Sequence, residues 1–349
     1  MTPQRVLMTG HRGYVGSVMA PVFRDAGHDV VGLDVDYYRG CDLMEPPDIS
    51  TIVRDVRDVE AADLRGFDAV VHLAALSNDP VGDLNPGWTE SINHTAARRT
   101  AAAASEAGVR RFLFASSCIM YGLSGGGEVD ETSRLNPQTD YARSKVLAEQ
   151  AISDLASDTF SPVHLRNGTI YGVSPRMRFD TVLNNLAGWA TTTGKITVLS
   201  DGTPWRPVVH IQDVARAFLA VLEAPVEIIH NQAFNIGSDE LNYQVRDLAR
   251  AVQRAVPGST LEILASEDAD QRTYRTSFTK FAHAFPTFRF ERDANAGAAE
   301  LASTLDDLGL THEEFVGDKF TRLKRLRRLL ADGQLDGDLR WRVAEGVSA

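Results

Sequence analysis

The sequence is poor in cysteine and contains no long apolar run. Its 349 residues include two cysteines, Cys41 and Cys118, which is too few for a framework of disulfides. No apolar run approaches the roughly 18 residues that a bilayer-spanning helix needs, and the first residues lack the basic-then-apolar layout of a secretory signal. We therefore expect a reducing, cytoplasmic location and no part of the chain in a membrane.

Positive charge is also scarce. The chain has 36 Lys and Arg against 47 Asp and Glu, a net charge of −11, and lysine occurs only at positions 145, 195, 280, 319 and 324. Binding to nucleic acid requires clustered cations, so we expect no nucleic-acid partner. Cysteine, histidine and carboxylate residues do not cluster at metal-ligand spacing, which predicts no metal site. The remaining composition, 43% hydrophobic and 24% charged, is that of an ordinary globular protein.

Short apolar runs alternate with helical patterns along the first half of the chain. A near-continuous apolar strand followed by a helix and another such strand indicates a parallel sheet covered on both faces. The handedness of these crossovers favours an α/β fold with a doubly wound Rossmann sheet. The expected strands are 5–9, 29–33, 67–73, 110–116 and 162–166, and the expected helices are 14–26, 94–107 and 141–155.

The second half is less regular and predicts a smaller C-terminal α/β domain. No linker or break in composition separates the halves, so we expect two domains that share an interface, 1–166 plus 205–237 and 167–204 plus 238–349. A basic amphipathic helix near 319–330 is expected to pack on its own domain, with a membrane surface or an acidic partner as the alternative. Its apolar stripe consists of Phe320, Leu323, Leu326 and Leu330.

Three glycines mark the junction between the first strand and the first helix. Gly10, Gly13 and Gly16 permit a tight turn and a close approach to a pyrophosphate, for which the helix N-terminus supplies N–H donors. Asp34 ends the next strand, where a carboxylate binds the adenosine ribose hydroxyls and repels a 2′-phosphate. The pattern predicts NAD in preference to NADP, although Arg12 in the loop offers a cation to a phosphate. The alternative is a structural glycine turn with a surface aspartate.

A second group of polar residues lies on an expected helix and at an expected strand end. Tyr141 and Lys145 are spaced so that both side chains share one face of the helix. A nearby ammonium favours the phenolate and lowers the tyrosine pKa from its ordinary value of about 10. Ser116 and Ser117 follow a strand at its carboxyl end, where open α/β sheets bind ligands. The helical spacing alone is typical of an exposed face, but the combination indicates acid/base chemistry.

Taken in order, these motifs resemble the extended short-chain dehydrogenase/reductases, most closely their NAD-dependent nucleotide-sugar epimerase/dehydratase branch. The resemblance covers about residues 3–280 and fades beyond them. It rests on Gly10-x-x-Gly13-x-x-Gly16, Asp34, Asp55-Val56, His72-Leu-Ala-Ala75, Asn93, Ser116-Ser117, Tyr121-Gly122, Tyr141-x-x-x-Lys145, Leu165-Arg166, Tyr171-Gly172 and Arg206-Pro-Val-Val-His210-Ile-Gln-Asp213.

The resemblance implies a role for each matched position. Tyr141 is the expected catalytic acid/base, Lys145 lowers its pKa and holds the nicotinamide ribose, and Ser117 binds the reacting hydroxyl. The C-terminal domain is then the substrate domain, and arginines are expected to hold a substrate diphosphate, with surface ion pairs as the alternative. The expected substrate-binding residues are Ser117, Thr169, Arg206 and Arg272, and the expected cofactor-binding residues are Gly10, Gly13, Tyr14, Val15, Gly16, Asp34, Asp55, Val56, Leu73, Ala74, Ala75, Asn93, Tyr141 and Lys145.

Departures from the family pattern bear on the reaction. Members that dehydrate at C4–C6 carry an Asp-Glu pair directly after the catalytic hydroxyl residue, whereas this chain has Cys118 and Ile119 there. Neither side chain replaces a carboxylate, and Cys118 is expected to be a small buried filler, with a weak proton donor as the alternative. Thr169 stands where the family usually has asparagine, which leaves the orientation of the substrate open. The Arg12 loop is similar to that of GDP-fucose synthase relatives, which use NADP, whereas Asp34 favours NAD.

These residues predict an NAD-dependent nucleotide-sugar epimerase that acts at a hydroxyl carbon such as C4 through a transient keto-sugar. A net nucleotide-sugar 4-dehydrogenase or reductase is the first alternative, a dehydratase is the next, and an NAD-binding regulator is the non-enzyme alternative. The expected partner is a nucleotide-diphosphate sugar, and the resemblance implies a homodimer built from helices 94–107 and 141–155. His210, between a strand and a helix, is expected to be structural.

Overall fold

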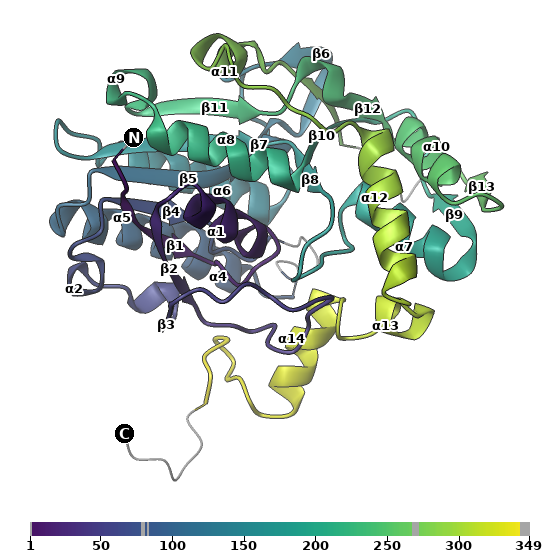
Figure 1. Ribbon diagram of the computed structural model, residues 1–349, viewed down its shortest axis with the longest axis horizontal. Coiled ribbons are helices and arrows are strands. Elements are labelled where there is room, and N and C mark those ends of the chain that lie inside the picture. The colour runs from purple at the N-terminus through teal and green to yellow at the C-terminus, as the bar shows by residue number, and fades with distance from the viewer. Residues whose placement is uncertain (1, 78–80, 82–83, 267–271, 343–349) are drawn as a thin grey trace.

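A computed structural model describes residues 2–77, 81, 84–266 and 272–342, whose largest sheet has helices on both faces (Figure 1). All neighbouring pairs of this sheet are parallel. The chain adds strands on one side of β1 and then returns to add strands on the other, so the order reverses between β1 and β4. This confirms the doubly wound fold. In spatial order the seven strands are β11 (Gln232–Ile236), β7 (Ser161–Asn167), β5 (Arg111–Ser117), β4 (Ala69–His72), β1 (Arg5–Thr9), β2 (Asp29–Asp34) and β3 (Thr51–Val53).

Alternating side chains of the central strands build the two halves of the core. On β1, Leu7 faces one apolar cluster, whereas Val6 and Met8 face the other, as the period of two along a strand requires. Each cluster is completed by a different set of helices. The Leu7 side is covered by α2 (Ala61–Leu64), α4 (Pro86–Thr89), α5 (Ala96–Glu106) and α6 (Asp140–Ser153), and the Met8 side by α1 (Gly16–Asp25), α8 (Ile211–Glu223), α9 (Val226–Ile229) and α11 (Thr279–Ala284).

A second group of elements has its own apolar cluster, in which Leu183, Val208 and Leu301 are fully buried. It contains a three-stranded sheet, β12-β10-β8, and a two-stranded sheet, β13-β9. The predicted boundaries between two domains stay a prediction. The elements are β8 (Thr169–Tyr171), α7 (Val182–Thr193), β9 (Lys195–Val198), β10 (Trp205–His210), β12 (Asn242–Gln244), α10 (Val245–Ala255), β13 (Thr260–Ile263), α12 (Ala294–Asp307) and α13 (His312–Val316), with β6 (Leu123–Val129) paired to β14 (Thr273–Thr276).

The C-terminal helix α14 (Arg322–Ala331), yellow in Figure 1, returns to the N-terminal part of the chain. Leu326 and Leu329 are buried in the same cluster as Leu7, so the basic helix packs on this chain. It was predicted to pack on its own, C-terminal domain, but it contributes to the apolar cluster of the Rossmann core and not to the cluster of the second group. Phe320, just before the helix, does belong to that second cluster. The helix therefore joins the two parts of the molecule.

The predicted elements differ from the observed ones mainly at their ends. The helix expected over 94–107 begins earlier, as a π-helical segment η2 (Glu90–Thr95), and continues as α5. The short segments η1 (Val56–Asp58), η3 (Cys118–Tyr121) and η4 (Asp239–Leu241) are single turns that periodicity does not reveal. Within the described residues, no helix is long and apolar enough to cross a membrane. Their His, Cys, Asp and Glu side chains form no group of three that could hold a metal ion.

Candidate active site

A cavity of about 770 Å³ lies at the carboxyl ends of the central strands. It includes the point between β1 and β4 where the strand order reverses, which is the place where open α/β sheets bind ligands. Residues of the central-sheet part and residues of the second group of elements both contribute to its walls. The lining residues lie within 10–16, 33–38, 54–56, 73–77, 115–119, 141–145, 167–186, 197–200, 206, 272–274 and 322, with Ile92, Phe218 and Val245.

The glycine loop after β1 leaves room for a ligand beside bare backbone. Gly10 has a φ of +73°, and a Cβ there would meet the Ala74 nitrogen at 2.7 Å. A Cβ on Gly16 would lie 2.4 Å from the Cα of His11, so only glycine permits this turn. Helix α1 starts at Gly16 without a side-chain cap, and the residues that lead into it, Gly13 to Gly16, line the cavity, so the N-terminal end of the helix lies at the cavity wall. The geometry fits a bound pyrophosphate.

Asp34 is fixed in orientation at the end of β2. Its Oδ2 accepts a hydrogen bond from the Arg12 backbone N–H at 2.9 Å, and its Oδ1 accepts one from the Asp36 N–H at 2.8 Å. A carboxylate has about four acceptor positions, so positions remain for ribose hydroxyls. Burial alone would raise the pKa of Asp36, but Arg176 and Arg12 lower it below the ordinary value. The Arg12 guanidinium is thus held by the Asp36 carboxylate at 2.6 Å.

Asp55 and Val56, expected at the adenine, also line the cavity. Asp55 Oδ1 accepts from Arg57 N and Nε, both at 2.9 Å, and Oδ2 accepts from Arg57 Nη2 at 2.6 Å. Burial would raise the pKa of Asp55, but these bonds to Arg57 hold it below the ordinary carboxyl value. The carboxylate therefore stays charged and has little freedom to turn.

Asn93 differs from the other expected cofactor residues because it is not among those that line the cavity. It is buried, with Oδ1 accepting from the Leu76 N–H at 2.8 Å and Nδ2 donating to the Leu76 carbonyl at 2.9 Å. Nδ2 also lies 3.2 Å from Ser144 Oγ on α6. Asn93 thus fixes the loop that carries Leu73, Ala74 and Ala75, which do line the cavity, against the helix that carries Tyr141.

Tyr141, Lys145 and Ser117 come together on one wall of the cavity. Lys145 Nζ donates to the Ala115 carbonyl at 2.7 Å and lies 5.7 Å from the centre of the Tyr141 ring. Burial lowers the pKa of Lys145 to about 7, although Glu149 raises it in part. Ser117 ends β5, and its Oγ accepts from the Ile119 N–H at 3.3 Å. The arrangement supplies a phenol, an ammonium and a hydroxyl to one ligand.

Cys118 lies beneath this wall and does not face the ligand. The side chain is 1% exposed, and its Sγ donates to the Arg166 carbonyl at 3.1 Å. Burial raises the pKa of the thiol well above its ordinary range. Cys118 is the expected buried filler, and Ile119 is the neighbour that lines the cavity. This wall thus lacks, at positions 118 and 119, the carboxylate pair of the 4,6-dehydrating relatives.

Thr169, Arg206 and Arg272 line the part of the cavity next to the second group of elements. Thr169 on β8 pairs with Val208 on β10, which places it two residues along from Arg206. Arg206 Nη1 donates to the carbonyls of Trp205 and Arg272, so the two arginines lie side by side. Arg206 and Arg272 give this part of the cavity a cationic character.

Sequence reasoning gave no place in the lining to four further arginines, Arg54, Arg176, Arg178 and Arg322. Arg178 donates to Ser77 Oγ at 2.7 Å and to the Ser77 carbonyl at 2.6 Å, which ties the second group to the loop after β4. Arg322 of α14 lies 4.7 Å above the Tyr38 ring, and its Nη2 is buried with no hydrogen-bond partner in the described part of the chain. The basic character of residues 319–328 was the signal for Arg322, but nothing in the sequence placed that helix beside β2.

His210 is structural, as expected. It is fully buried, its Nε2 lies 2.7 Å from Glu300 Oε2, and its Nδ1 accepts from the Gln212 N–H at the start of α8. It is not among the residues that line the cavity. The histidine therefore caps a helix and pairs α8 with α12.

Comparison with known proteins identifies the family of this chain. Residues 6–237 match the profile of the NAD dependent epimerase/dehydratase family. The UDP-glucose 4-epimerase of Corynebacterium glutamicum is 30% identical over 261 residues, which are 70% of this chain and 78% of the relative. The UDP-glucose 4-epimerase of Bacillus subtilis is 25% identical over 276 residues, 71% of this chain and 81% of that one.

Solved structures show the same fold. MoeE5, in complex with UDP-glucuronic acid and NAD, is 25% identical and has a TM-score of 0.75 over 87% of this chain and 99% of its own. The NDP-hexosamine 5,6-dehydratase TunA, at 23% identity and a TM-score of 0.78, covers 87% of this chain and 98% of its own. The glycine loop, Asp34 and the Tyr141–Lys145 pair thus stand on a fold that binds NAD in these relatives. The chain belongs to the NAD-dependent epimerase/dehydratase family and is an NAD-dependent enzyme of the extended short-chain dehydrogenase/reductase type.

Proposed function

We propose that this chain is a nucleotide-sugar epimerase that inverts a hydroxyl carbon, C4 of the sugar, through a transient keto-sugar. The observation that carries the proposal is one continuous cavity that joins the glycine loop, the Tyr141–Lys145–Ser117 wall and the Arg206–Arg272 pair. The relatives named UDP-glucose 4-epimerase support the reaction at C4, and the nucleotide sugar bound to MoeE5 supports the substrate class.

Tyr141 is the proposed acid/base. As the phenolate it takes the proton of the sugar hydroxyl, and as the phenol it returns that proton to the oxygen of the keto-sugar. NAD held at the glycine loop would supply the hydride chemistry, the removal of a hydride from the carbon that carries this hydroxyl and its return to the opposite face of that carbon. The Lys145 ammonium stabilises the phenolate, and the Ser117 hydroxyl holds the reacting oxygen beside it. No net oxidation results, so the cofactor can stay in place.

Arg206 and Arg272 are proposed to hold the diphosphate of the substrate. Their planar donor groups suit phosphate oxygens, and both line the cavity beside the second group of elements. A substrate fixed at its diphosphate leaves the sugar ring free to turn, which is what inversion requires. Thr169, which lines the same part of the cavity as Arg206, is proposed to contact the sugar.

A net oxidoreductase would use the same residues, whereas the wall at Cys118 and Ile119 disfavours a 4,6-dehydratase. We also propose a homodimer through α5 and α6, where Leu147 is 41% exposed on the outer side of α6. A cytoplasmic location and the absence of a nucleic-acid partner belong to the same proposal, supported by the net charge of −11. Sedimentation of the purified protein tests the dimer.

The test begins with the cofactor. The protein is purified and then denatured. The nicotinamide cofactor that it releases is identified by its mass. Retained NAD, with no change of absorbance near 340 nm when nucleotide sugars are added and an inverted product by NMR, supports the epimerase. NADH or NADPH that appears or disappears in step with the sugar means a net oxidoreductase. Binding of NAD without binding of any sugar nucleotide means a regulator.

The variant Tyr141→Phe tests the acid/base. Loss of a general acid/base costs on the order of 10²–10⁴ in rate, and NAD should stay bound. Tyr243→Phe, which removes a hydroxyl from a residue outside the cavity lining, is the matched control. A Tyr141→Phe protein with the wild-type rate would refute the assignment.

A further inference from the structure

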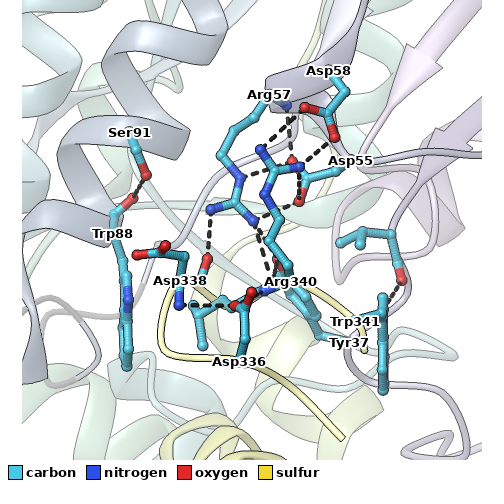
Figure 2. A network of polar contacts seen from close by, with 12 residues as sticks. Tyr37, Asp55, Arg57, Asp58, Trp88, Ser91, Asp336, Asp338, Arg340 and Trp341 are labelled. Carbon is cyan, nitrogen blue, oxygen red and sulfur yellow. Dashed lines mark hydrogen bonds and ion pairs between the residues drawn. The ribbon is translucent and has the colours of Figure 1, made fainter. Parts of the chain in front are cut away.

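The last described residues form a small hairpin, whose polar contacts with the rest of the chain are drawn in Figure 2. In this C-terminal hairpin, residues 334–342, Leu335 and Trp341 pair in an antiparallel bridge. Asp336 closes the turn, with its Oδ1 accepting from the Arg340 N–H at 2.8 Å. Leu339 adopts the left-handed conformation with φ +57°. The hairpin is therefore a folded element with its own turn.

Two leucines anchor the hairpin in the core. Leu335 and Leu339 are at most 1% exposed and belong to the same apolar cluster as Val56 and Trp88. The Trp88 indole N–H donates to the carbonyl of Gly337 at 2.9 Å. The hairpin is thus attached to the part of the Rossmann core from which the predicted adenine residues project.

Arg57 connects the hairpin to Asp55. One edge of its guanidinium donates to both carboxylate oxygens of Asp55, at 2.9 and 2.6 Å. Nη1 donates to the carbonyl of Asp338 in the hairpin at 2.6 Å. One planar group with five fixed donors thus holds the carboxylate and the hairpin in a single arrangement.

Arg340 makes a second connection to the same carboxylate, as Figure 2 shows. Its Nη1 lies 3.3 Å from Asp55 Oδ2, and its Nη2 donates to Asp58 Oδ1 at 3.1 Å. The Arg340 side chain is about one-third exposed, so replacing it would leave no cavity in the apolar core.

The hairpin also contacts the segment after β2. The Trp341 indole N–H donates to the carbonyl of Val35 at 2.7 Å, and the Tyr37 hydroxyl donates to the carbonyl of Leu339 at 2.6 Å. Val35 and Tyr37 follow Asp34 and, like Asp55, line the cavity. The hairpin itself is absent from the lining, so it touches the outer side of three residues whose inner side faces the ligand.

We propose that the C-terminal hairpin positions the adenosine pocket of the bound NAD and sets how slowly NAD leaves. The inference rests on the proposed cofactor residues Asp34 and Asp55. Arg340 and Trp341 act as positioning residues, because they reach the ligand only through Asp55 and Val35. Docking of the hairpin and binding of the adenosine favour the same arrangement of Asp55 and Val35. The coupling is reciprocal, so bound adenosine stabilises the docked hairpin by the same factor by which the docked hairpin raises the affinity for adenosine. A redox-neutral enzyme gains from this, since its cofactor need not exchange between turnovers.

The test compares Arg340→Gln and Trp341→Phe with wild type, and uses Arg327→Gln on the exposed face of α14 as the matched control. Trp341→Phe keeps an aromatic ring at this position and removes the indole N–H that donates to the Val35 carbonyl. We expect each variant to release NAD about fivefold to tenfold faster, since one hydrogen bond or charged contact of the pocket wall is lost. The affinity for AMP should fall by a similar factor, and the affinity for nicotinamide mononucleotide should not change. Arg327→Gln should behave as wild type.

The contrast between AMP and nicotinamide mononucleotide separates positioning from general damage. Equal losses for both mononucleotides, or unchanged NAD release in both variants, would overturn the inference. Hydrogen exchange of the hairpin amides gives an independent readout, because NAD should slow it in wild type and less so in the variants. If the wild-type protein binds neither NAD nor AMP, the proposed function itself fails. If the wild-type protein binds both and the substitutions change neither binding nor release, only the inference about the hairpin fails.

Discussion

The replacement Lys145→Met is expected to stabilise the apoprotein at low pH and to abolish its activity. Lys145 is 2% exposed, with its ammonium between the Ala115 carbonyl and the face of the Phe114 ring, 4.6 Å from the ring centre. Burial lowers the pKa of this lysine to about 7. Methionine fills a similar volume without a charge, so it removes the penalty of burying the ammonium.

The pH dependence of this effect follows from the shift. In the unfolded chain the lysine has its ordinary pKa of about 10.4. Between about pH 7 and pH 10 the unfolded state therefore holds more protons, and the wild-type protein gains about 1.4 kcal/mol of stability per pH unit. Below pH 7 the whole penalty, roughly 4–5 kcal/mol from a shift of about three and a half units, is present. Above pH 10 it is gone.

Lys145→Met carries none of this penalty, but it leaves the Ala115 carbonyl without its donor. That loss costs about 1–3 kcal/mol at every pH. The variant should thus be more stable than wild type by about 2 kcal/mol at pH 6.5, and less stable at pH 10. Urea unfolding of the two apoproteins at several pH values measures the difference, with Lys195→Met on the exposed edge of β9 as the control. A variant that is destabilised equally at every pH would refute the reasoning.

Three further substitutions test other parts of the site. Gly16→Ala places a Cβ against the His11 backbone, so it should lower the free energy of unfolding by about 1–3 kcal/mol and weaken NAD binding. Urea unfolding measures the first effect and an NAD titration the second. An unchanged affinity for NAD would contradict the role of the glycine loop in binding the pyrophosphate. Arg166→Met leaves Glu149 buried without the partner that lowers its carboxyl pKa, and should cost about 3–5 kcal/mol at pH 8 and less at pH 5, where the carboxyl is neutralised. A loss that does not depend on pH would contradict this. Asp34→Asn should lower the affinity for NAD at least about tenfold and reduce the ratio of the affinities for NAD and NADP. Competitive titration of the two cofactors measures this ratio.

Much of the fold followed from periodicity because the central strands are buried on both faces. Runs such as Val6–Met8 and Phe112–Phe114 are apolar throughout, and a parallel sheet between two layers of helices is the arrangement that buries such runs. β3 escaped the prediction because its three residues are partly exposed and its sequence has no apolar alternation. The π-helical turn at 90–95 has no signal of its own, so the helix start was misplaced.

The candidate site was predictable where a single residue type does the work. Glycine at positions 10 and 16 is required by backbone contacts, and the tyrosine and lysine of α6 depend only on local helical spacing. Arg178, Arg322 and the C-terminal hairpin were not predictable, because each reaches the cavity or its wall through tertiary contacts with β2 or β4 loops more than 100 residues away in sequence. Asn93 was expected to line the cofactor channel, but in the structure its buried amide bonds the backbone N–H and carbonyl of Leu76.

The choice between NAD and NADP shows how a tertiary contact decides the meaning of a motif. Arg12 in the glycine loop offers a cation to a 2′-phosphate when the loop is considered alone. In the structure its guanidinium is held at 2.6 Å by Asp36, a buried residue with φ +53° whose other oxygen accepts from Arg176 at 3.1 Å. An added phosphate would have to displace a carboxylate already paired on both oxygens, and would meet the charge of Asp34 as well. Both aspartates therefore act in the same direction, and the loop that resembles that of NADP-using relatives serves NAD in this chain.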